Sequence, residues 1–111
     1  MNKLDSSISE GVFDMNKIFI QRKLKEQENF IKKIFHVTEI GIFGSFFKGE
    51  QKADSDIDIL VEFKKGHKDF FNYMRLKHYL GEMFGKKVDL VIKNAIKAEL
   101  REKILNEVEY A

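Results

Sequence analysis

Two aspartates two residues apart, Asp56 and Asp58, begin an alternating segment of polar and apolar residues, DIDILVEF. On a strand, such side chains project from the same face, with Cα atoms about 6.6 Å apart. Carboxylate oxygens arranged in this way suit hard divalent cations such as Mg²⁺ and Mn²⁺. The plainer interpretation is that both aspartates lie on the solvated face of an ordinary strand.

A third carboxylate, Asp89, interrupts the apolar segment KVDLVI. Because an unpaired buried carboxylate costs several kcal/mol, a residue of this kind usually has a charged partner or faces a cleft. Together with Asp56 and Asp58 it could complete a site for two metal ions. An exposed face of an edge strand would explain Asp89 equally well at this stage.

Gly44 and Ser45 follow the apolar segment VTEIGIF and precede the aspartate pair by ten residues. We expect a tight turn there, leading into a short helical segment with Ser45 as its N-cap. Free backbone N–H groups at such a turn bind anions, and glycine lets a phosphate approach the main chain. An ordinary strand-to-helix turn is the alternative. A phosphate turn beside three carboxylates would form a metal–nucleotide site.

Strands and helices must position these residues, and the spacing of apolar residues predicts them. Strands are expected over residues 37–43, 56–63 and 87–92, where β-branched and aromatic residues dominate. Helices are expected over 16–35, 68–84 and 95–108, and a polar loop over 50–55. The helix over 68–84 would end at Gly85 and would carry a broad apolar face that includes Phe70, Tyr73, Met74, Leu76 and Leu80. This order predicts an α+β fold, a small mixed sheet covered by helices.

Composition limits the remaining possibilities. With 111 residues the chain makes one domain, which we place at residues 15–111; residues 1–14 lack periodicity and are expected to form a loose arm. The absence of cysteine excludes disulfides and thiolate chemistry, and a net charge of +2 does not indicate nucleic acid. No apolar run suits a membrane span or a signal peptide, so we expect a cytoplasmic protein.

The segment GSFFKGEQKADSDIDILVEF resembles the signature of the small MNT-type nucleotidyltransferases of the DNA polymerase beta superfamily. Their pattern is Gly-Ser, ten residues, then Asp-x-Asp. The later segments KVDLVI and IKAELREKILNEVEYA are similar to that family's last strand and helix, so the resemblance covers residues 18–110. One departure is that Phe47-Lys48 stands where the family often has Ala-Arg.

This resemblance implies a nucleotidyltransferase fold and transfer of a nucleoside monophosphate, AMP from ATP, to a hydroxyl. Asp56, Asp58 and Asp89 would be both the catalytic residues and the ligands of two Mg²⁺ ions, with Mn²⁺ as an alternative. Gly44 and Ser45 would hold the β- and γ-phosphates. Lys48 would supply a positive charge without the two-pronged geometry of arginine.

The resemblance also implies a partner. MNT proteins are commonly paired with helical HEPN toxins, and the chain would then be an antitoxin that adenylylates a tyrosine of its HEPN partner. Two alternatives remain open. The chain could neutralise its partner by binding alone, with eleven phenylalanines providing contact surface. It could also be a homo-oligomeric enzyme that modifies a small molecule.

Overall fold

The computed structural model describes residues 2–44 and 56–111, and it confirms an α+β fold with a mixed sheet. No helix in these two ranges is long and apolar enough to cross a membrane. The elements are α1 (Asn2–Ile34), β1 (Val37–Phe43), β2 (Ile57–Phe63), α3 (Phe70–Phe84), β3 (Val88–Ile92), the 3₁₀ helix η1 (Lys93–Ala95), α4 (Ala98–Glu107) and β4 (Glu109–Tyr110).

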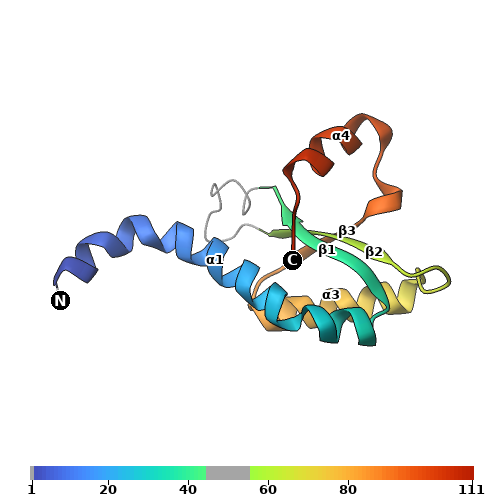
Figure 1. Cartoon of the computed structure of the whole chain (residues 1–111), viewed down its shortest axis with the longest axis horizontal. Helices are drawn as coiled ribbons and strands as arrows, with labels where there is room; N and C mark the ends of the chain where they lie inside the picture. Colours follow the sequence, from blue (N-terminus) through green and yellow to red (C-terminus); the bar gives the residue numbers. More distant parts are fainter. Residues whose placement is uncertain (1, 45–55) are drawn as a thin grey trace.

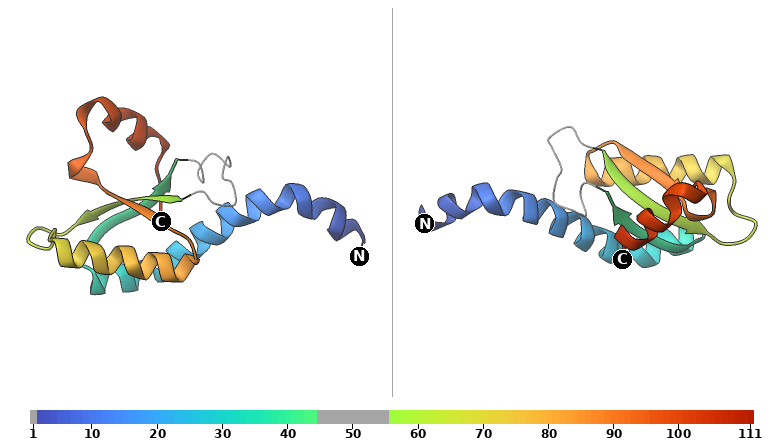
Figure 2. Two further views of the ribbon diagram at one scale, coloured as in Figure 1. Left: turned by 180° about the vertical axis from the view of Figure 1, so that it is seen from behind. Right: turned by 90° about the horizontal axis from the view of Figure 1, so that it is seen from above.

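The four strands lie in the order β3-β2-β1-β4. β2 pairs antiparallel with β1 and parallel with β3, while β4 pairs antiparallel with β1. The parallel pair is joined by α3 in a β-α-β crossover. α3 and the second half of α1 lie on one side of the sheet, and α4 lies on the other (Figures 1 and 2). The sheet ends that carry Gly44, Asp56 and Asp89 therefore lie together.

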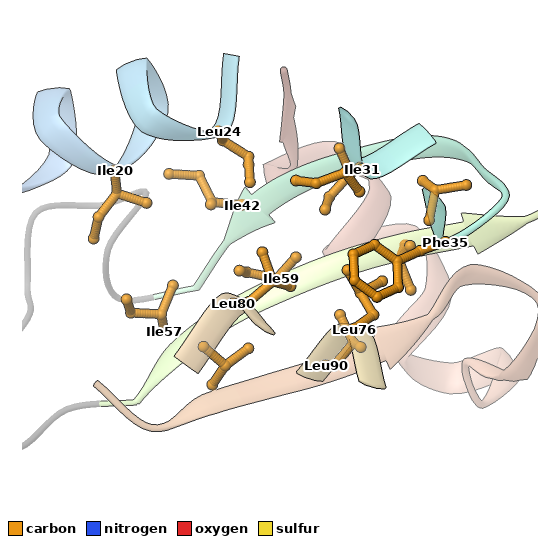
Figure 3. Close-up of a cluster of buried hydrophobic side chains, with 14 of the residues drawn as sticks. Ile20, Leu24, Ile31, Phe35, Ile42, Ile57, Ile59, Leu76, Leu80 and Leu90 are labelled. Carbon is orange, nitrogen blue, oxygen red and sulfur yellow. The ribbon is translucent and has the colours of Figure 1, made fainter. Parts of the chain in front are cut away.

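The core fills the layer between the sheet and the two helices α1 and α3 (Figure 3). The predicted alternation of β2 is confirmed, because Ile57, Ile59 and Val61 are fully buried on this side. Leu76 and Leu80 of α3 meet them. The remaining core residues are Ile20, Leu24, Ile31, Phe35, Val37, Ile40, Ile42, Phe63, Val88 and Leu90.

Helix α1 differs from the prediction at its start. It begins at Asn2, so residues 2–14 are helical, whereas the helix was predicted to begin at residue 16. The second half has the predicted spacing, with Ile20, Leu24 and Ile31 buried. The first half extends beyond the sheet (Figure 1). Helix propagation adds one hydrogen bond per residue and does not require an apolar face, which explains why periodicity missed this part. The division into an arm and a domain stays a prediction.

The C-terminal region also differs. The single helix predicted over 95–108 is η1 followed by α4, and α4 contains no buried residue; its Leu100 is 47% exposed. After α4 the chain returns as β4, a two-residue strand that was not predicted. β4 lies so close to β1 that a Cβ atom on Gly41 would stand 2.7 Å from the Glu109 carbonyl oxygen. The glycine therefore permits this pairing.

Helix α3 starts two residues later than predicted and ends as predicted. The Asp69 carboxylate caps it by accepting a hydrogen bond of 2.9 Å from the Asn72 N–H. Gly85 closes it in the left-handed conformation, at φ 63°. Phe70 and Met74, which we placed on the apolar face, are 69% and 41% exposed.

Asn72 is the one buried polar side chain among the described core residues. Its amide Nδ2 donates to the Phe35 carbonyl at 2.7 Å and to the His67 carbonyl at 3.0 Å. It thereby joins the end of α1 to the loop before α3. The two helices that cover the sheet are tied together at this point.

We expect Asn72→Ala to lower the free energy of unfolding by about 1–3 kcal/mol, because a buried carbonyl at Phe35 and a partly buried one at His67 lose their donor. Urea unfolding followed by circular dichroism measures this. The exposed Asn94→Ala is the matched control and should change stability by less than about 0.5 kcal/mol. Equal stability of the two variants would show that the Asn72 contacts contribute nothing.

Candidate functional site

The structure brings all three predicted aspartates to one end of the sheet. Asp56 precedes β2 directly, Asp58 is the second residue of β2, and Asp89 is the second residue of β3. In the parallel ladder, Asp58 is the register partner of Asp89, and on its other side it pairs with Phe43. Paired positions share a sheet face, so the Asp58 and Asp89 side chains project from the same side. Asp89 is exposed and the other two are partly buried.

Gly44 directly follows β1 beside Asp58 and has the positive φ of 77° that favours glycine. A Cβ atom at this position would overlap the Asp58 carboxylate oxygen Oδ2, inside van der Waals contact. Two independent constraints therefore require glycine here: the backbone conformation and the approach of the carboxylate. Ser45 and Lys48, the other two predicted phosphate-binding residues, lie outside the described residues, as do the short helix and polar loop predicted between Gly44 and Asp56.

The carboxylates act on one another electrostatically. The pKa of Asp58 is raised from 3.8 to about 6, first because of burial, then because of the negative charges of Asp89 and Asp56 and a hydrogen bond with Asp89. A carboxyl group with this pKa is charged at neutral pH but at a cost in free energy. A cation bound beside it would lower that cost.

Tyr73 of α3 joins the same region and was not predicted as part of it. Its hydroxyl donates to the Leu90 carbonyl at 2.7 Å, one residue beyond Asp89. Burial and the charge of Asp89 raise the pKa of the Tyr73 hydroxyl. Sequence analysis assigned Tyr73 only to the apolar face of its helix. A tyrosine in such a position needs a partner for its hydroxyl, and that need was the available signal.

The donor set fits a hard divalent cation that arrives with other ligands. Among the described residues, no three His, Cys, Asp or Glu side chains are arranged to hold a metal ion by themselves. Mg²⁺ commonly takes one or two carboxylates and completes its shell with water and substrate phosphates. Asp56, Asp58 and Asp89 offer carboxylate oxygens of that kind.

Comparisons with known proteins agree on the family. The model of the nucleotidyltransferase domain matches residues 24–111. The chain is 38% identical over 91 residues to a Thermococcus cleftensis protein named protein adenylyltransferase MntA, matching 82% of this chain and 91% of that one. A minimal nucleotidyltransferase structure aligns with a TM-score of 0.69 at 28% identity, covering 87% of this chain and 93% of that one. The crystal structure of a toxin–antitoxin with AMP-PNP aligns with a TM-score of 0.60 at 26% identity, covering 86% and 69%.

We expect Asp58→Asn to stabilise the protein at pH 7.5 without divalent cations, by on the order of 1–2 kcal/mol. The folded state raises the pKa of Asp58 to about 6, so its charged form destabilises folding above that pH. Below about pH 4 the carboxyl is protonated in both states, and the advantage of asparagine should vanish. Thermal unfolding from pH 3 to 8 measures the difference.

The exposed Glu102→Gln on α4 is the control and should show no such pH-dependent gain. Added Mg²⁺ should reduce the difference in stability between the native protein and Asp58→Asn at pH 7.5. A gap that stays constant over the whole pH range would contradict the electrostatic account.

Proposed function

Because the chain belongs to the nucleotidyltransferase domain family, we propose that it is a protein adenylyltransferase. It transfers AMP from ATP to a hydroxyl group of a partner protein, and the partner is a HEPN toxin that the chain neutralises as an antitoxin. The observation that carries this proposal is the pairing of Asp58 with Asp89 across the parallel strands, directly beside Gly44.

Asp56 and Asp58 are the proposed ligands of Mg²⁺, and Asp89 completes the set on the acceptor side. When bound, the divalent cations supply positive charge that stabilises the attacking oxygen, the leaving oxygen and the phosphates. The elevated pKa of Asp58 supports this assignment, since the repulsion among the three carboxylates favours a bound cation. Mn²⁺ suits the same oxygen ligands.

Asp89 has a second proposed role as proton acceptor. In the transfer step, the acceptor oxygen forms a bond to the α-phosphorus, and the bond from that phosphorus to the oxygen bridging to the β-phosphate breaks. Pyrophosphate leaves, and the hydroxyl proton passes to the Asp89 carboxylate. The exposure of Asp89 supports this role, because an incoming hydroxyl can reach it.

The main chain at Gly44 is proposed to contact the phosphates of the nucleotide. Its lack of a side chain leaves the main chain open to a phosphate, and the resemblance assigns the β- and γ-phosphates to Gly44 and Ser45. Lys48 is proposed to add positive charge to the triphosphate. Its long flexible side chain makes it a point charge rather than a two-pronged clamp.

The protein partner is supported by the relatives. The Thermococcus cleftensis relative is named a protein adenylyltransferase, and the similar toxin–antitoxin structure carries AMP-PNP, an ATP analogue. We extend both properties to this chain as a proposal. Tyrosine is the proposed acceptor residue on the HEPN partner, as the resemblance implies.

The test is transfer of label from α-phosphate-labelled ATP to the copurified helical partner, with Mg²⁺ present. We expect label on the partner and an added mass of about 329 Da. Asp56→Asn/Asp58→Asn should lower the rate by at least about 10³-fold, and Asp89→Asn by at least about 10²-fold. The exposed Glu82→Gln should retain full activity.

Each other outcome identifies an alternative. A partner that is neutralised without label, equally well by the native protein and by Asp56→Asn/Asp58→Asn, would make the chain a binding antitoxin. Label that appears only in the small-molecule fraction would make it a small-molecule nucleotidyltransferase.

Gly44→Ala should abolish transfer, because its Cβ atom displaces the Asp58 carboxylate. Gly66→Ala is the matched control: Gly66 has a similar φ of 88°, but its Cβ atom would meet nothing within 4 Å. Both variants bear comparable backbone strain of about 1 kcal/mol. Only Gly44→Ala should lose activity, measured at a temperature where both are folded. Equal activities would remove Gly44 from the site.

A further inference from the structure

A groove of about 420 Å³ runs along β3, the edge strand of the described sheet. Leu90, Val91 and Ile92 form one wall. The other is formed by Lys68 and Asp69, which precede α3, and by Phe70 and Tyr73 in its first turn. η1 closes it through Ala95. The groove therefore lies between the outer edge of the sheet and the helix that covers its core side.

Aromatic side chains stand exposed at this groove. Phe70 lines it and is 69% exposed, and its neighbour Phe71 is 79% exposed. Their rings contact each other edge to face, with centroids 6.1 Å apart. Two such rings left in water lose the stabilisation that burial would give them. Their position favours contact with an apolar side chain of another molecule.

The groove adjoins the candidate functional site along β3, although Asp89 itself does not line it. Asp89 directly precedes Leu90, and the Tyr73 hydroxyl, which lines the groove, bonds to the Leu90 carbonyl. The negative charge of Asp89 acts on that hydroxyl and contributes to the raised pKa of Tyr73. A molecule in the groove thus extends toward the carboxylate proposed to receive the acceptor proton.

The part of the groove at Lys68 and Ile92 is basic. A second hollow, lined by Lys64, Lys65, Lys68 and one acidic residue, Glu62, adjoins the groove and shares Lys68 and Ile92 with it. All three lysines are exposed. We call these three lysines the lysine cluster. They outnumber the two acidic residues beside them, Glu62 and Asp69, and the Asp69 carboxylate already caps α3. The surface therefore changes from acidic at Asp89, through apolar at Phe70 and Leu90, to mainly basic at the lysine cluster.

We propose that this groove and the lysine cluster bind the acceptor segment of the partner protein in an extended conformation. The hydroxyl-bearing residue lies at Asp89, an apolar or aromatic side chain packs against Phe70, and acidic residues meet the lysine cluster. Because a strand rises about 3.3 Å per residue, Asp89 and Ile92 lie about 10 Å apart. The acidic residues then lie three or more positions from the modified hydroxyl. This inference rests on the proposed function and adds what the acceptor sequence must contain.

The test compares two charge-reversal variants with the same net charge. The first, the cluster variant, carries Lys64→Glu/Lys65→Glu/Lys68→Glu. The second, the control variant, changes three exposed lysines elsewhere and carries Lys33→Glu/Lys97→Glu/Lys103→Glu. We expect the first to raise KM for the protein acceptor at least 10-fold more than the second does. KM for ATP and kcat at saturating acceptor should stay within twofold. Phe70→Ala should raise the acceptor KM in the same way, and thermal unfolding verifies that each variant is folded.

Acceptor binding without ATP separates this inference from the proposed function. If no label is transferred by the native protein, the proposed function fails, but weaker partner binding by the cluster variant alone still supports the docking surface. If transfer occurs and both triple variants have equal acceptor KM, the docking surface is wrong. An RNA oligonucleotide that binds the native protein but not the cluster variant, with acceptor KM unchanged, would overturn it in favour of a nucleic-acid surface.

Discussion

Parallel pairing of β2 with β3 holds Asp58 across from Asp89, and the rest of the structure maintains that pairing. Two carboxylates held side by side repel each other, so the register must be fixed by other interactions. The alternate residues supply them, since Ile57, Ile59 and Leu90 are buried against the helices. A slip of one residue would turn aspartates into this core and isoleucines into water. The hydrophobic effect thus imposes an arrangement that the charges alone oppose.

The cost of that arrangement falls mainly on Asp58. Burial contributes more to the raised pKa of Asp58 than either neighbouring negative charge does. Gly44 adds to the enclosure by allowing the carboxylate to lie against the main chain. Charged groups that serve binding rather than folding are expected to destabilise the folded protein until cations bind to them. The stability of the chain comes from the apolar layer on the other side of the sheet.

Much of this arrangement was predictable because strands with one buried face have a period of two. That period placed Ile57, Ile59 and Val61 in the core and Asp58 on the opposite face, and β1 matched its predicted bounds. Pairing between strands carries no comparable local signal, so the strand order came only from the structure. β4 was missed because two residues show no period, and the start of α1 because residues 2–14 have no apolar periodicity in the sequence.

The wrong prediction that Phe70 and Met74 of α3 are buried has a different cause. Phe70 and Met74 have the spacing of core residues, but α3 begins at Phe70, close to the edge strand, where the sheet offers little surface to cover them. Helical periodicity reports which face a residue occupies, and it does not report how far the neighbouring layer extends. A domain with few residues has a narrow sheet, so some apolar positions necessarily extend past its edge. In this chain Phe70 does so at β3, the edge strand that also carries Asp89. An edge strand with apolar residues next to a carboxylate site is suited to receive an extended segment of another protein. The apolar residues that extend past the edge of the sheet are therefore the ones on which the proposed docking surface depends.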